Sequence, residues 1–142
     1  MYQSIVVGTD GSATAERAVA EAIKLAEALD ADLHVVSAYE PLRDVRVEGA
    51  KEGTVLPDTN VQAVVEQAGA AARIRGVRVN THALAGDPGD ALLEVAEQET
   101  ADLIVVGSRG MHGMKRVLGS VPNKVSHQAR CSVLIVCTDQ AG

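Results

Sequence analysis

Apolar residues follow two different periods in turn along this chain. Residues 4–9 form an apolar run, and after Asp10-Gly11-Ser12 the apolar residues recur every three or four positions up to Leu29. This change of period predicts a strand, a turn and an amphipathic helix. The same succession then repeats along the chain. We expect further strands at 33–39, 77–84, 102–107 and 132–138, and further helices over 61–74, around 91–96 and at about 120–129.

Five strands that alternate with four helices predict an α/β fold, because parallel neighbours need a crossover connection. We expect a single doubly wound five-stranded parallel sheet with the order 3-2-1-4-5 and helices on both faces, a Rossmann-like architecture. The most uniformly apolar early and late strands, 4–9 and 102–107, should lie centrally. In this order the chain reverses direction across the sheet between strands one and four, so we expect a ligand crevice outside their carboxyl ends.

The length of the chain suits a single domain over residues 1–142, because a core of this size needs no disulfide or metal for stability. Residues 40–57 are polar and contain Pro41, Gly49, Gly53 and Pro57. We interpret this segment as a mobile loop within the domain. Hydrophobic residues make up 46% of the chain although Phe and Trp are absent. The core must therefore be aliphatic, which suits a parallel sheet covered by alanine-rich helices.

The formal net charge of −6 and the scarcity of aromatic residues argue against nucleic acid as a partner, since binding it needs a basic face and often stacking rings. No apolar run reaches the roughly 18 residues of a membrane span. The first residues enter a strand at once, without the basic region of a secretory leader. We therefore expect a cytoplasmic protein with no membrane partner.

The cysteines and histidines show no pattern of metal ligands or disulfides. Cys131 and Cys137 are six residues apart on one expected strand, which places them on the order of 20 Å apart and beyond disulfide reach. The histidines at positions 34, 82, 112 and 127 have no ligand-like spacing to one another or to the cysteines. We expect ordinary surface or packing histidines and no metal site.

The segment 107–120 has the composition of a phosphate-binding loop. It joins an apolar strand to a helix and contains four glycines together with Arg109, Lys115 and Arg116. Gly107 and Gly110 let the backbone approach an anion closely, and a helix N-terminus at Ser120 favours phosphate. An alternative is a plain surface loop before a capped helix, with Ser120 as the N-cap. The motifs of P-loop enzymes and of dinucleotide-binding dehydrogenases are absent, so neither class is supported.

Four segments, taken together, resemble the universal stress protein family along the whole chain. These are VVGTDGS, LHVVSAY, AGDPGDALLEVAEQETADLIVVGSRG and LGSVPNKVSHQARCSVLIV. The family motif is Gly-x-x-Gly, nine residues, then Gly-Ser or Gly-Thr, and in the ATP-binding branch these residues hold the phosphates and ribose. Here residues 111–118 make the spacer eight residues long. Some relatives of this type bind cyclic AMP, so the resemblance leaves the identity of the nucleotide open.

The resemblance implies a nucleotide site by position. Asp10 is expected near the ribose or adenine, and it is also expected to cap the first helix. The backbone of Val35 is expected to meet adenine. The implied nucleotide-binding set is Gly8, Thr9, Asp10, Val35, Val106, Gly107, Ser108, Arg109, Gly110, Gly119, Ser120 and Val121. We expect no catalytic and no metal-ligating residues among them.

These observations predict a cytoplasmic adenine-nucleotide-binding protein of stress response or regulation, with ATP bound where strands one and four meet. Mg²⁺ is expected only as the partner of ATP. The chain offers no convincing base for phosphoryl transfer, so we expect at most slow hydrolysis or autophosphorylation. One alternative is a sensor of cyclic AMP or AMP. Another is a partner-binding module with a vestigial site, in which residues 40–57 form the recognition surface.

The last strand, 132–138, is expected at an edge of the sheet, where a long apolar strand invites pairing with another chain. Pairing with its own copy across a two-fold axis would cover this edge, and the family resemblance also implies such a homodimer.

Overall fold

The structure, a computed structural model, describes residues 1–40, 59–108 and 119–138. Within these ranges strands and helices alternate. Their bounds are β1 Ser4–Gly8, α1 Ala13–Leu29, β2 Asp32–Tyr39, α2 Thr59–Ile74, β3 Val79–Ala85, α3 Pro88–Gln98, β4 Leu103–Gly107, α4 Ser120–Gln128 and β5 Ser132–Val136. Neighbouring strands pair in parallel. The sheet order is β3-β2-β1-β4-β5, which confirms the predicted order.

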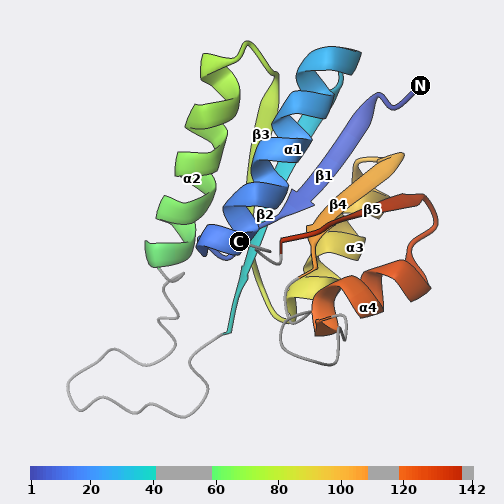
Figure 1. Ribbon diagram of the computed structural model, residues 1–142. Helices are drawn as coiled ribbons and strands as arrows, with labels where there is room; N and C mark the ends of the chain where they lie inside the picture. The colour runs from blue at the N-terminus through green and yellow to red at the C-terminus, as the bar shows by residue number, and fades with distance from the viewer. Residues whose placement is uncertain (41–58, 109–118, 139–142) are drawn as a thin grey trace.

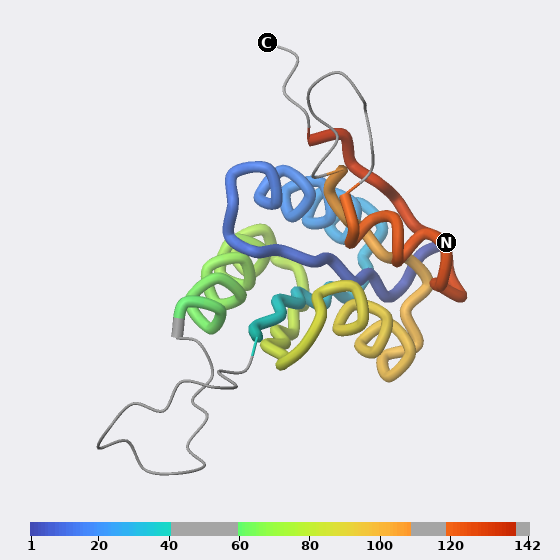
Figure 2. The backbone as a smooth tube through the Cα atoms, turned by 90° about the horizontal axis from the view of Figure 1, so that it is seen from below, coloured from blue at the N-terminus to red at the C-terminus, as the bar shows by residue number. Residues whose placement is uncertain are grey.

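The helices cover both faces of this sheet. In Figure 1, α1 and α2 lie on one face, and α3 and α4 lie on the other. Figure 2 shows the same two pairs from below, with the strands running between them. Because α1 follows β1 on one face and α4 follows β4 on the other, the chain leaves these neighbouring strands in opposite directions.

Alternate residues of the central strands face the two helical layers, as a parallel sheet requires. In β1, Ile5 and Val7 pack on the α1 side, whereas Val6 packs on the α3 side. All of these side chains have no exposed surface. Burial on both faces explains why β1 and β4 read as continuous apolar runs, and their central position confirms the prediction.

The start of α1 differs from the expectation. The N-cap is Ser12, whose hydroxyl accepts a hydrogen bond from the Ala15 amide at 3.1 Å, so the prediction that Asp10 caps this helix is wrong. Asp10 Oδ1 instead accepts from the Ser12 amide at 2.9 Å. Gly11, with a φ of +83°, makes the extra turn that moves the helix start beyond Asp10.

Other boundaries also differ from the sequence expectation. Gly119 is the N-cap of α4, and Ser120 is the first helical residue rather than its cap. β5 ends at Val136, so Cys137 follows the strand instead of belonging to it. The predicted loop 40–57 lies outside the described residues apart from Glu40. No helix in the described ranges is long and apolar enough to cross a membrane.

Candidate functional site

An open cleft lies at the carboxyl ends of β1, β2 and β4. It encloses about 660 Å³, including the part open to solvent. Its position is where the strand order reverses, and loops that diverge to opposite faces leave such a crevice between them. The lining residues are Gly8, Thr9, Asp10, Thr14, Ala15, Val36, Ser37, Ala38, Pro88, Leu92, Val106, Gly107, Val121, Pro122 and Thr138.

The structure brings together many of the predicted site residues from three distant parts of the sequence. Those that line the cleft are Gly8, Thr9, Asp10, Val106, Gly107 and Val121. They come from the end of β1, the end of β4 and the first turn of α4. Loops that are about a hundred residues apart therefore meet at one crevice, as the switch-point rule requires.

Other predicted residues lie elsewhere. Val35 is fully buried on the opposite face, among the residues that pack on α1 and α2, while its neighbours Val36, Ser37 and Ala38 line the cleft. Gly119 and Ser120 precede the lining residue Val121 without lining the cleft themselves. Arg109 and Gly110 lie outside the described residues.

Ser108 supports the cleft from behind. It is buried, and its hydroxyl accepts a hydrogen bond from the Thr138 amide at 2.9 Å. The two hydroxyl oxygens, Ser108 Oγ and Thr138 Oγ1, are 3.3 Å apart. Thr138 itself lines the cleft, and a Cβ on Gly107 would come within 2.9 Å of its Cγ2 atom. Ser108 thus positions a lining residue that sequence reasoning did not identify.

The loop after β1 is held by its own hydrogen bonds. The Thr9 amide donates to the Val36 carbonyl at 3.0 Å, and the Thr9 hydroxyl accepts from the Gly11 amide at 3.1 Å. The Asp10 carboxylate turns back onto the Ser12 amide. These bonds fix the loop before any ligand arrives, which lowers the entropy lost on binding.

The N-terminal turn of α3 forms one wall of the cleft, through Pro88 and Leu92. Neither residue is among the predicted site residues. A Cβ on Gly8 would come within 2.9 Å of Leu92 Cδ1, so glycine at position 8 allows α3 to pack closely on the end of β1. Ser37 and Ala38 were also missed, although the carboxyl-end rule applies to β2 as it does to β1.

A charged cluster joins the N-terminal end of α3 to α4. Lys124 Nζ lies 3.2 Å from Asp87 Oδ2 and 2.8 Å from Asp90 Oδ1. Asp87 is also the N-cap of α3 and accepts from the Asp90 amide at 3.0 Å. That backbone hydrogen bond, followed by the bond from Lys124, lowers the pKa of the Asp87 carboxyl. The ionised carboxylate therefore holds together the two helices that flank the cleft.

We expect Asp87→Ala to lower the free energy of unfolding by about 1 kcal/mol at pH 7, because it removes the helix cap at a half-exposed position. A lowered native pKa stabilises the fold above the unfolded pKa of about 3.9, and this stabilisation is lost as the pH falls through the native value. Urea denaturation at pH 7 and pH 3 should show the difference between variant and parent shrinking at pH 3. Glu94→Ala, an exposed change on the same helix, is the control and should change little at either pH.

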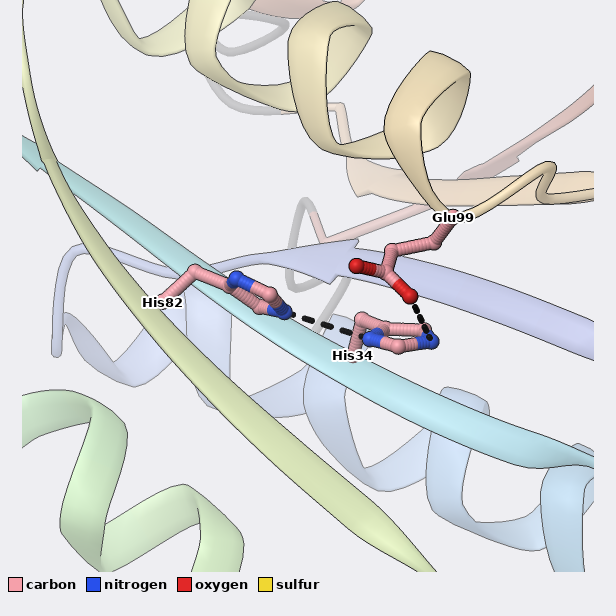
Figure 3. A group of neighbouring side chains, drawn as sticks. All are labelled: His34, His82 and Glu99. Carbon is pink, nitrogen blue, oxygen red and sulfur yellow. Dashed lines mark hydrogen bonds and ion pairs between the residues drawn. The ribbon is translucent and has the colours of Figure 1, made fainter.

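Three further side chains meet on the face of the sheet that α3 covers. His34 of β2 has Nδ1 at 3.2 Å from Nε2 of His82 in β3, and its Nε2 lies 3.9 Å from Glu99 Oε1 at the end of α3. Figure 3 shows His34 between its two partners, with one ring nitrogen facing each. The two histidines are 48 positions apart. No local spacing could indicate this cluster, because only the β2–β3 pairing creates it.

The fold and the cleft define a class: a small α/β protein with a preformed ligand crevice where a doubly wound sheet reverses its strand order. The model of the universal stress protein family matches residues 1–136, and the chain belongs to this family.

Other universal stress proteins are similar to this chain along nearly its whole length. A universal stress protein of Mycobacterium tuberculosis is 39% identical, with 96% of this chain and 97% of that protein covered. One from Methanocaldococcus jannaschii is 34% identical, with 96% and 82% covered. The crystal structure of a universal stress protein in complex with cAMP has a TM-score of 0.78 and 36% identity, covering 97% of this chain and 98% of that one.

Proposed function

We propose that this protein binds an adenine nucleotide in the cleft at the ends of β1 and β4 and acts as a regulatory binding protein. One observation carries the proposal. The cleft at the strand reversal is lined by residues of both loops, among them six that the family resemblance implies for nucleotide binding. The similar protein that was crystallised with cAMP supports the class of ligand.

The lining chemistry suits the parts of a nucleotide. Apolar side chains at Val36, Ala38 and Leu92 offer a surface for a purine, and Thr9 and Asp10 offer oxygens for ribose hydroxyls. At the other side, α4 has Gly119 as its N-cap, with no side-chain hydrogen bond at the cap and no acidic residue in its first turn. Within this turn no carboxylate competes for its first backbone amides, which suit a phosphate group.

We propose ATP, as its magnesium complex, as the first candidate ligand and expect little turnover. Among the described lining residues, Asp10 is the sole carboxylate, and none is Lys, Arg or His. Efficient phosphoryl transfer uses a carboxylate for the metal, a cationic clamp and a positioned base. The described part of the cleft offers only the first of these, so binding rather than catalysis is the proposed role.

Cyclic AMP is the second candidate, for two reasons. The similar protein of known structure was crystallised with it, and the spacer 111–118 is one residue shorter than in the ATP-binding motif. A shorter connection suits a ligand with fewer phosphates, because fewer anionic groups need to be surrounded.

Calorimetric titration of nucleotide-stripped protein tests the proposal. The titrants are ATP with Mg²⁺, cyclic AMP and AMP in parallel, with GTP as the control for the base. Tighter binding of ATP supports the first candidate, and tighter binding of cyclic AMP or AMP supports the second. Absence of binding by all three adenine nucleotides would contradict the proposal and favour a partner-binding module.

We also propose that the protein forms a homodimer through the outer edge of β5. This strand lies at the end of the described sheet, and Leu134 is 39% exposed on it. An apolar edge strand is stabilised when a second copy pairs with it.

We expect Leu134→Glu to convert the dimer to monomer, because two like charges would face each other across the two-fold axis. Size-exclusion chromatography with light scattering measures the mass directly. Ile74→Glu is the control, since Ile74 is 84% exposed at the end of α2, a helix that packs on β2 and β3 at the other end of the sheet from β5. A monomeric parent protein, or a variant that stays dimeric, would contradict the proposed interface.

A further inference from the structure

The cluster of His34, His82 and Glu99 is separate from the cleft. None of its members lines the cleft, and His34 pairs with the middle of β1 rather than with its carboxyl end. The three side chains come from β2, β3 and the C-terminal end of α3. The nucleotide-binding proposal therefore gives this cluster no role.

The donor atoms lie close enough to share one ion. One ligand atom from each residue lies within 4.8 Å of the others. His34 Nδ1 and His82 Nε2 are 3.2 Å apart, whereas two nitrogens on one tetrahedral zinc ion are about 3.4 Å apart. Glu99 Oε1 faces the other ring nitrogen of His34, Nε2, so one ion shared by all three residues requires the carboxylate to turn to the Nδ1 side of that ring. Glu99 can do so because its side chain is 40% exposed at a helix end.

We propose that His34, His82 and Glu99 bind a divalent transition-metal ion of the Zn²⁺ type. Imidazole nitrogens and carboxylate oxygens are established ligands of zinc, and three of them leave a fourth position for water. Harder cations such as Mg²⁺ and Ca²⁺ prefer oxygen ligands, so this donor set selects against them.

The surroundings of the two imidazoles fix one ring and leave the other accessible, which suits metal binding. The His34 side chain is only 6% exposed, so packing holds its ring in one orientation. His82 lies half-buried on β3, at the end of the described sheet, which leaves a path for an ion from solvent.

An ion at this position would join two strands to the end of a helix. Because it binds the folded arrangement and not the separated segments, it would stabilise the native state. Without an ion, a single hydrogen bond between the two imidazoles accounts for the same distance. The experiment must therefore distinguish a metal site from a plain histidine pair.

The test is titration of the chelator-treated full chain with Zn²⁺ in the absence of nucleotide. Calorimetry should show one ion per chain, and thermal unfolding should move to higher temperature with added Zn²⁺. His82→Gln and Glu99→Ala should each weaken binding by roughly tenfold or more. His127→Gln is the matched control, since His127 is exposed on α4 and bonded to the Asn123 carbonyl; it should leave the affinity unchanged.

Substitution with Co²⁺ identifies the donor types. Co²⁺ bound at this cluster should give visible ligand-field bands and no thiolate charge-transfer band. A charge-transfer band would indicate binding to Cys131 or Cys137 instead. His34 is left unchanged because it is buried, and far-ultraviolet circular dichroism checks that both variants fold. No Zn²⁺ binding, binding with thiolate character, or an affinity that neither variant lowers would overturn the proposal and leave only a histidine pair.

Discussion

Ala38→Phe is expected to weaken adenine-nucleotide binding by about a hundredfold, equivalent to about 2.7 kcal/mol. Ala38 lies near the carboxyl end of β2, on the side of the sheet that packs on α3, and it lines the cleft together with Val36 and Leu92. A phenyl ring at this position occupies the apolar space proposed for the purine. The nucleotide can bind only by displacing the ring, which costs buried apolar contact.

The measurement is calorimetric titration of the variant with the nucleotide that the parent binds most tightly. Ala85→Phe is the matched control, because Ala85 is exposed at the end of β3 and does not line the cleft. The affinity of the Ala85→Phe variant for the nucleotide should stay within about twofold of that of the parent. An equal loss of affinity in both variants would indicate a general effect of the added ring. Unchanged affinity in Ala38→Phe would contradict the proposal that the purine binds in this part of the cleft.

Ile104→Ala is expected to lower the free energy of unfolding by about 3–4 kcal/mol, within the range for isoleucine-to-alanine changes in a packed core. Ile104 has no exposed surface and lies in β4, where it packs with the residues of α3 and α4. Removing its outer carbons leaves a cavity that the strands on either side cannot close. A melting temperature lower by about 10 °C should accompany this loss.

Urea denaturation of the parent and the variant measures this change. Ile74→Ala makes the same chemical change at a residue that is 84% exposed, and it should shift stability by less than about 0.5 kcal/mol. Because the two substitutions remove the same atoms, their difference reports mainly burial, with a smaller contribution from the strand and helix propensities of the two residues. Similar effects at positions 74 and 104 would contradict the placement of Ile104 in the core.

The sheet was predictable from the sequence because burial leaves a local signal. β1 and β4 are covered on both faces and therefore read as unbroken apolar runs, whereas β3 alternates because its burial is partial. Right-handed crossovers then leave few possible strand orders. The position of the cleft followed from the order alone, and the residues at the ends of β1 and β4 were found by the same rule.

Some residues that line the cleft were not predicted, because nothing in the local sequence indicates which helices and strands pack against one another there. Leu92 packs against Gly8, and Thr138 is held by Ser108, yet each reads in the sequence as an ordinary residue of its own segment. The expectation at Val35 concerned its backbone, which the burial of its side chain does not contradict. Because neighbouring residues of a strand face opposite sides, it is Val36 whose side chain lines the cleft, while that of Val35 packs on the other face.

The chain's own pattern thus determined the elements, their central and edge positions and the site of the crevice, because hydrophobic period reports which face of an element is buried. The walls of the cleft, the Asp87–Lys124 link and the meeting of His34 with His82 depended on the tertiary structure. A period records that a face is covered, but not which distant residue covers it. That partner is decided only when strands and helices pack in three dimensions.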